Sequence, residues 1–287
     1  MEVKKVIENY LEEVELKKCK ATYQCYCSHL NCFYEFCICS NYLTVESIDK
    51  NFYLKYLKYS RDKSLCAKTI NKRFRLFLLA CKKNKIILDL DHECLKEKNI
   101  RFDVLNEDSL KKIINYCYRL SEDEKDITNK MLILLLLDTG VRINELLNIK
   151  ISNIDFEKNK ILLTVTKTNT DRIVYFNKYT SAVIKESLKM NRNNSDYLLF
   201  NFRDMRPYTY DCSRSLFRNM KKELNIIKLH PHMFRHTFIT NLINNGAPVF
   251  LVQQLAGHAS IKTTQIYVHQ NEKKLEECYK QYSSYGF

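Results

Sequence analysis

Glycine is scarce in this chain, with four residues among 287. No two glycines have the spacing of a dinucleotide-binding fingerprint or a phosphate-binding P-loop, and neither loop can be built without glycine. The longest uninterrupted apolar run, residues 131–137, is far too short to span a bilayer. The opening residues, MEVKK, lead into charged positions and predict no signal peptide. We therefore expect a soluble, cytoplasmic protein that does not bind membranes.

Charge of one sign dominates. The chain has 47 Lys and Arg against 33 Asp and Glu, which gives a formal net charge of +14. The excess is shared, because residues 1–104 carry a net charge of about +6 and residues 105–287 about +8. Two basic halves are typical of a protein that binds a polyanion such as nucleic acid. A lysine-rich composition inherited from an AT-rich genome would produce the same excess, so charge alone leaves both explanations open.

Cysteine is frequent, with twelve residues in the chain. Five of them are clustered: Cys25, Cys27, Cys32, Cys37 and Cys39. Four of the five form two C-x-C pairs, 25/27 and 37/39, which lack the C-x2-C spacing of zinc sites. The cluster follows a helical pattern in which cysteine fills small apolar positions. We expect free thiols and no metal site.

The N-terminal third shows only helical periodicity. Polar breaks divide it into about four helices, and they fall near residues 17–22, 40–47 and 60–68. A charged stretch without periodicity follows. These features predict a helical domain over residues 1–98, a linker over 99–104 and a second domain over 105–287.

The second domain opens with a helix that begins after Asn106, where acidic residues favour the N-terminal end. A very apolar helix is predicted over 128–137. Segments 161–166 and 172–176 flank a polar stretch and predict a hairpin, with a third short strand near 149–154.

Helices resume after the hairpin. Pro248 stands where a helix can begin in its first turn, and Gly257 follows the end of that helix. The predicted fold class is mainly α: an N-terminal four-helix domain followed by an α+β domain with one small antiparallel sheet.

Five of the seven histidines lie between residues 230 and 269. His232 and His236 have the i, i+4 spacing of a zinc-binding helix, but Met233 stands where a metalloprotease needs glutamate. In the alternative interpretation, His232 and Arg235 occupy one face of a helix start, where backbone N–H groups also favour an anion. Each pairing alone is weak evidence for a metal site or an anion site.

Five motifs, in order, resemble those of the tyrosine recombinase (integrase) family. They are DTGVRINELLNI (138–149), VTKTNTDRIV (165–174), HPHMFRHTFIT (230–240), LAGHAS (255–260) and TTQIYVH (263–269). Two further segments resemble the core-binding domain of the family: KATYQCYCSHLNCF (20–33) and KTINKRF (68–74). The resemblance implies the fold described above and an enzyme that breaks and rejoins DNA strands at specific sites.

The resemblance also implies roles for individual residues. Arg142 and Arg235 would bind the two non-bridging oxygens of the scissile phosphate, because guanidinium stays charged and donates parallel hydrogen bonds. Glu145 would support the site, and Lys167 would protonate the leaving 5′-hydroxyl.

The remaining members of the implied site are two histidines and a tyrosine. His232 and His258 would bind the phosphate and move protons, and Tyr267 would be the nucleophile. His236 lies roughly 100° around the helix from Arg235 and is expected to buttress the site.

Family members act as tetramers on two DNA duplexes and pass through a Holliday junction, without a metal, ATP or other cofactor. The expected partners are therefore double-stranded DNA with an inverted-repeat core site and three further copies of this chain, with residues 272–282 as the segment that docks on its own domain or on a neighbour. Two domains without an arm-binding domain resemble Xer proteins and small mobile-element recombinases, which act at the nucleoid. A non-catalytic DNA-binding relative and a monomeric DNA-relaxing topoisomerase are the alternatives.

Candidate DNA contacts lie on two predicted helices that carry basic residues. The first set comprises Lys68, Asn71, Lys72 and Arg75, and the second comprises Arg214 and Arg218. Both sets are equally compatible with solvated helix faces.

Overall fold

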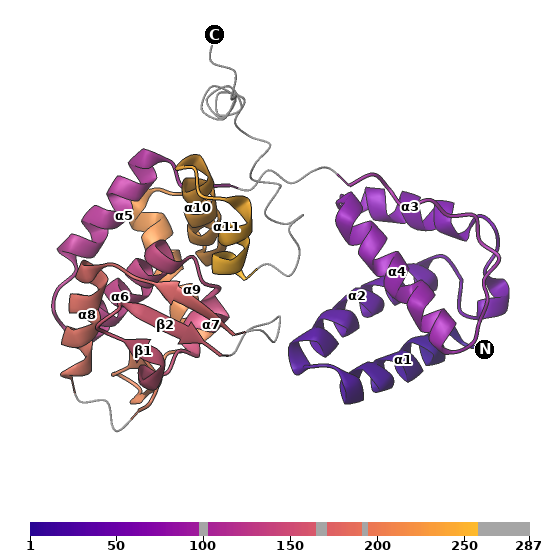
Figure 1. Ribbon diagram of the computed structural model, residues 1–287. Coiled ribbons are helices and arrows are strands. Elements are labelled where there is room, and N and C mark those ends of the chain that lie inside the picture. The colour runs from indigo at the N-terminus through magenta and orange to yellow at the C-terminus, as the bar shows by residue number, and fades with distance from the viewer. Residues whose placement is uncertain (98–102, 165–170, 191–194, 258–287) are drawn as a thin grey trace, which may run out of the picture. The chain divides into compact units, whose positions relative to one another are not determined.

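The chain forms two compact units, Met1–Ile100 and Arg101–Phe287 (Figure 1). The structure is a computed structural model that describes residues 1–97, 103–164, 171–190 and 195–257. Most of the predicted linker, 99–104, lies outside the described residues.

Four α-helices form the described part of the first unit, as the sequence predicts. They are α1 (Val3–Lys17), α2 (Lys20–Cys39), α3 (Phe52–Asp62) and α4 (Ala67–Lys83), with a short 3-10 turn, η1 (Val45–Ser47), after α2. Aromatic side chains fill the core between them. The fully buried Phe33 stacks on Phe77 with ring centroids 4.5 Å apart and lies 4.8 Å from the ring of Tyr56.

The clustered cysteines of α2 differ in burial. Cys37 is fully buried, and burial raises the pKa of its thiol to about 12, so it behaves as a small apolar side chain. Cys25, Cys27 and Cys32 are half-buried, whereas Cys39 is exposed at the end of the helix. The prediction that these cysteines fill apolar positions is therefore confirmed for Cys37 and wrong for Cys39.

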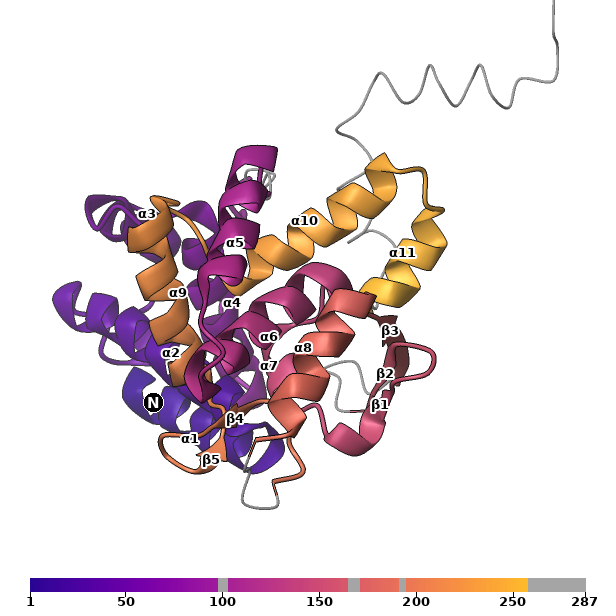
Figure 2. The same cartoon turned by 90° about the vertical axis from the view of Figure 1, so that its left-hand side faces the viewer.

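The second unit is built around one buried helix. Its helices are α5 (Glu107–Arg119), α6 (Glu124–Thr139), α7 (Ile143–Leu147), α8 (Lys178–Leu188), α9 (Tyr210–Leu224), α10 (Pro231–Asn244) and α11 (Val249–Ala256), with a 3-10 turn, η2 (Ile151–Asn153). Helix α5 begins where the sequence predicts, and Asn106 caps it, since the Asn106 side chain accepts the Ser109 N–H at 2.8 Å. Every side chain over 131–136 of α6 is buried, and α8 and α10 pack against this helix (Figure 2).

A three-stranded antiparallel sheet confirms the predicted hairpin. Its strands are β1 (Ile154–Asp155), β2 (Lys160–Leu163) and β3 (Arg172–Tyr175), in that order across the sheet. Ile161 pairs with Val174, and both side chains point into the core. The period-2 alternation of burial explains why this segment could be predicted from its sequence.

A second sheet corrects the expectation of a single one. It pairs β4 (Phe200–Asn201) with β5 (Arg206–Pro207). Strands of two residues are too short to show an alternating pattern, and the turn between them contains no glycine.

The last two helices of the described chain lie side by side, and α11 also packs against β3 (Figure 2). Pro248 is the N-cap of α11 rather than a residue of its first turn, whereas Pro231 is in the first turn of α10. Gly257 follows α11 as predicted. Among the described helices, none combines the length and the apolar character needed to cross a membrane.

Candidate active site

Arg142 and Glu145, which the sequence places one turn apart, are in direct contact. Arg142 is the N-cap of α7, and Glu145 is the third residue of that helix. The Glu145 carboxylate accepts the Arg142 backbone N–H and its Nη1–H, both at 2.8 Å. An acidic side chain that reaches back to the N-cap is a common way to begin a helix. The local sequence thus orients the Arg142 guanidinium while it starts α7.

The Glu145 carboxylate is an ionised group in the interior, because its side chain is only 4% exposed. Burial by itself would raise the pKa of Glu145, but hydrogen bonds from Arg172 and from the Arg142 backbone outweigh it and lower this pKa to about 2. The carboxylate therefore stays charged at neutral pH and holds two guanidinium groups.

Arg235 projects from α10 and is 4% exposed. Its Nη1 donates to the Gly140 carbonyl at 2.9 Å, and its Nη2 donates to the Ala256 carbonyl. Arg142 donates from Nη2 to the next carbonyl, that of Gly257, at 3.3 Å. The two arginines that the sequence assigns to one phosphate therefore converge on adjacent peptide groups.

The two histidines of α10 lie beside these arginines. The ring centroids of His232 and His236 are 6.4 Å apart. His232 is exposed, yet desolvation and the neighbouring His230, Arg235 and Arg142 lower its pKa. Partial burial lowers the pKa of His236 to about 4. Both shifts favour the neutral ring, and the shift of His236 makes that ring a poor proton acceptor at pH 7.

Three predicted site residues, Lys167, His258 and Tyr267, lie outside the described residues, as does the predicted docking segment 272–282. His258 directly follows Gly257, whose carbonyl binds Arg142.

The sequence interpretation missed one residue of this cluster, Arg172. It is the first residue of β3, and its side chain is 8% exposed. Its guanidinium binds both carboxylate oxygens of Glu145, at 3.1 and 2.7 Å, and its Nε donates to the Leu255 carbonyl at 3.1 Å. No local pattern marks this contact, because Glu145 lies 27 positions earlier in the chain.

Comparison with known proteins identifies the family. Residues 103–274 match the phage integrase family, and residues 2–87 match the phage integrase SAM-like domain. The chain belongs to the phage integrase family. It is a tyrosine recombinase, an enzyme of site-specific recombination.

Similar proteins extend over most of the recombinase. The "probable integrase/recombinase" of Acholeplasma phage L2 is 36% identical over 200 residues, which cover 70% of this chain and 68% of that protein. Tyrosine recombinase XerA of Pyrococcus horikoshii is 30% identical over 281 residues, which cover 95% of this chain and 92% of that protein. The Tn1549 transposon integrase, solved in complex with transposon right end DNA, has the same fold, with a TM-score of 0.79 at 20% identity over 99% of this chain and 100% of that one.

The predicted DNA contacts of the recombinase need one correction. Asn71 is 2% exposed, and its amide binds the Leu95 backbone at 2.8 and 2.9 Å, so it fixes the segment after α4 and does not face a ligand. Lys68, Lys72 and Arg75 of α4 are exposed. On α9, Arg214 and Arg218 are exposed as well, and Arg214 forms a 3.3 Å ion pair with Asp211.

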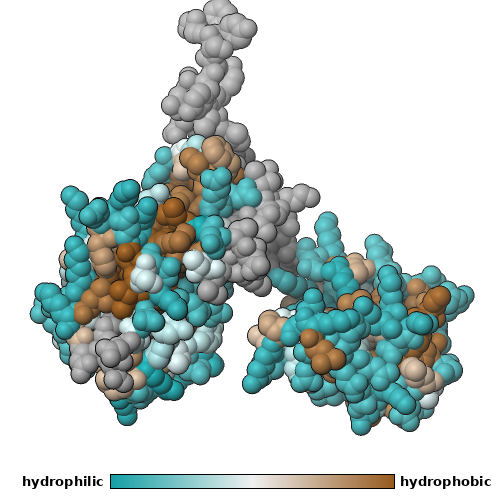
Figure 3. Space-filling view, turned by 60° about the horizontal axis from the view of Figure 1, so that its bottom comes forward, coloured by the Kyte–Doolittle hydropathy of each residue, from teal (hydrophilic) through white to brown (hydrophobic). Residues whose placement is uncertain are grey.

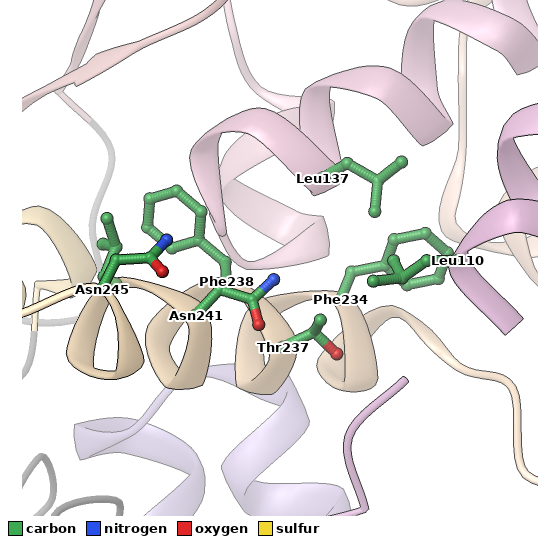
Figure 4. A pocket seen from close by; sticks show the side chains of 8 residues that line it. Leu110, Leu137, Phe234, Thr237, Phe238, Asn241 and Asn245 are labelled. Atoms are coloured by element: carbon green, nitrogen blue, oxygen red, sulfur yellow. The ribbon is translucent and has the colours of Figure 1, made fainter. Parts of the chain in front are cut away.

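The recombinase also has an apolar pocket of about 120 Å³ between α5, α6 and α10 (Figure 4). It is lined by Leu110, Leu137, Phe234, Thr237, Phe238, Asn241, Leu242 and Asn245. None of these side chains titrates, so the pocket offers no acid or base. In Figure 3 the visible face of the first unit is mainly hydrophilic with small apolar patches, whereas that of the second unit carries a broader apolar band. Within the described ranges, no group of three or more His, Cys, Asp or Glu could hold a metal ion.

Proposed function

We propose that this recombinase cleaves one DNA strand through Tyr267, forming a 3′-phosphotyrosine and a free 5′-hydroxyl. The observation that carries the proposal is the convergence of Arg142 and Arg235 on the adjacent Gly257 and Ala256 carbonyls. Guanidinium groups that meet at one point form a binding site for the oxygens of a phosphodiester.

The arginines supply the electrostatic part of the mechanism. A phenol with a pKa near 10 is a weak nucleophile at neutral pH. Positive charge around the phosphate favours the phenolate and neutralises the charge that builds up on the pentavalent transition state. The Tyr267 phenol gives its proton to a neutral imidazole, that of His232 or His258, and its oxygen forms a bond to phosphorus. The bond to the 5′-oxygen breaks, and Lys167 gives that oxygen a proton. The new phosphodiester keeps the energy of the old one, so the hydroxyl of another strand can reverse the step.

The histidines and Glu145 support this chemistry. His232 and His258 bind the phosphate and transfer protons, a role that suits a neutral imidazole. Glu145 holds Arg142 at the start of α7. His236 buttresses the histidine and arginine side chains of α10.

We further propose that the substrate is double-stranded DNA with an inverted-repeat core site. Both units would contact it, through the exposed basic residues of α4 and α9. The Tn1549 integrase complex with transposon DNA supports DNA as the partner. Four copies would act on two duplexes and exchange strands through a Holliday junction, with residues 272–282 docking on a neighbour. The setting is the cytoplasm, at the nucleoid, in a Xer-like or mobile-element system.

A nicked suicide substrate tests the proposal. Cleavage near the nick releases a short oligonucleotide, so we expect a covalent protein–DNA adduct to accumulate. The adduct should form equally well in EDTA, because side chains supply the positive charge. Binding without an adduct would identify a non-catalytic relative. Adduct formation that a chelator abolishes and a divalent ion restores would contradict the mechanism. Relaxation of supercoiled DNA by a monomer would favour a topoisomerase.

A further inference from the structure

The C-terminal end of α11 is held by three arginines from three different elements. Arg172 of β3 donates to the Leu255 carbonyl, Arg235 of α10 to that of Ala256, and Arg142 at the start of α7 to that of Gly257. The last carbonyls of a helix have no partner within the helix and carry partial negative charge. Guanidinium groups therefore satisfy them well.

Arg172 and Arg142 share a second partner, Glu145, whereas Arg235 donates to the Gly140 carbonyl. Nη1 and Nη2 of Arg172 bind the two oxygens of Glu145, while its Nε binds the Leu255 carbonyl. Glu145 in turn binds the backbone and side chain of Arg142. Arg172 thus connects the residue that orients Arg142 with the helix end that leads directly into His258.

The carboxylate that both of its Nη groups bind distinguishes Arg172 from a phosphate ligand, whereas the carbonyls that Arg235 binds are neutral. All three guanidinium nitrogens of Arg172 donate into the protein, and its side chain is 8% exposed. The Arg142 side chain, at 23% exposure, is more accessible. A phosphate that approaches from solvent can therefore reach Arg142 while Arg172 stays behind it.

We propose that Arg172 is a positioning residue of the recombination reaction. It fixes the end of α11, which directly precedes His258 in the sequence, against the Glu145–Arg142 pair. The proposal rests on the function proposed above, in which Arg142 binds the scissile phosphate and Tyr267 attacks it. Its consequence is that Arg172 governs the rate of cleavage and leaves DNA affinity nearly unchanged.

The first test separates rate from affinity. Arg172→Ala and Arg172→Lys are compared with wild type in single-turnover adduct formation on saturating nicked DNA and in equilibrium DNA binding. We expect a rate loss on the order of 100-fold for Arg172→Ala, because a displacement of about 1 Å can have that effect. Lysine keeps the charge but cannot bind the carboxylate and the carbonyl together, so Arg172→Lys should recover part of the rate. Affinity should stay within about threefold for both variants, because neither change removes a phosphate contact.

A second pair of variants tests the proposal without removing the buried charge. Gly257 has φ +64°, and a Cβ there would lie 2.7 Å from Nη1 of Arg172 and 2.9 Å from its Cζ. Gly246 has φ +86°, and a Cβ there would meet nothing within 4 Å. Alanine strains the left-handed backbone at both positions, but only Gly257→Ala pushes the guanidinium away from Glu145.

Gly257→Ala should therefore slow adduct formation, whereas Gly246→Ala should form the adduct at the wild-type rate. Equal rates for these two variants would overturn the proposal. So would an Arg172→Ala variant whose affinity falls as much as its rate, since that result makes Arg172 a phosphate ligand. Tyr267→Phe in the same assay keeps the two proposals distinct. If Tyr267→Phe forms an adduct, the proposed function is contradicted. If Tyr267→Phe forms no adduct but the Arg172 variants cleave at the wild-type rate, only the positioning role of Arg172 is contradicted.

Discussion

A carboxylate that is 4% exposed needs partners for its charge, and Glu145 has two arginines. Arg142 lies at 2.8 Å and Arg172 at 2.7 Å from its oxygens. Removing a negative charge from such a group leaves buried cations without compensation, which destabilises a protein far more than breaking a surface ion pair.

Glu145→Gln should lower the free energy of unfolding by roughly 3–5 kcal/mol at pH 7. A fall in pKa from 4.5 to about 2 corresponds to a contribution on the order of 3 kcal/mol. Because the folded-state pKa is lowered, this contribution is present above pH 4.5 and is lost as the pH falls toward 2. The matched control is Glu186→Gln, which removes an exposed pair with Lys189 and should change stability by less than about 1 kcal/mol. Denaturant titration measures the free energy of unfolding of both variants, and an equal loss of stability in the two would contradict this account of Glu145.

His236 should make stability depend on pH in a different window. Its pKa in the folded chain is lowered from 6.5 to about 4, mainly by burial. The unfolded chain therefore binds a proton that the folded chain excludes, so stability is full above pH 6.5 and falls as the pH drops toward 4. In denaturant titrations across this range, His236→Gln should reduce the pH slope. A variant with the slope of wild type would show that His236 is not the group responsible.

Residues joined by local spacing were predictable, and residues joined only by the fold were not. Arg142 and Glu145 are three positions apart, so helix geometry brings them together before any tertiary contact forms. Arg172 joins them only after β3 packs beside α7 and α11. For Asn71 the error is the opposite, because local spacing predicted a DNA contact that the fold excludes. The place of Asn71 in a basic helical motif suggested a DNA contact, but its amide turns inward to Leu95.

At the scale of elements, periodicity explains what could be predicted. The helices of the first unit follow an apolar pattern of period 3.6, and the four-residue strands β2 and β3 follow one of period 2. The pairing of β4 with β5 depends on two residues in each strand, and no pattern develops over that length.

The burial of Asn71 narrows the candidate DNA-binding face of α4 to Lys68, Lys72 and Arg75. These residues are spaced i, i+4 and i+7, so they share one side of the helix.

This face of α4 should contribute to the salt dependence of DNA binding. Replacing Lys68, Lys72 and Arg75 together by alanine in the full chain should weaken binding and reduce the slope of log K against log salt by about 0.9 for each lost phosphate contact. The control replaces three other exposed lysines of the same unit, Lys4, Lys5 and Lys58, and changes the net charge equally. Identical slopes for the two triple variants would show that α4 makes no phosphate contact.

At the scale of the whole molecule, each unit has a hydrophobic core of its own. The division into Met1–Ile100 and Arg101–Phe287 agrees with two separate family matches, over residues 2–87 and 103–274. The basic excess in both parts favours a protein that contacts DNA with each unit and performs its chemistry in the second.

The most direct measurement is adduct formation by Tyr267→Phe on the nicked substrate, with Tyr279→Phe as the matched control. Only the phenol oxygen is lost in each variant, so both should bind DNA as wild type does. The account predicts that Tyr279→Phe accumulates the covalent 3′ adduct at the wild-type rate and that Tyr267→Phe forms none. A Tyr267→Phe variant that still traps the 3′ end would contradict the assignment of the nucleophile, and with it the proposed active site.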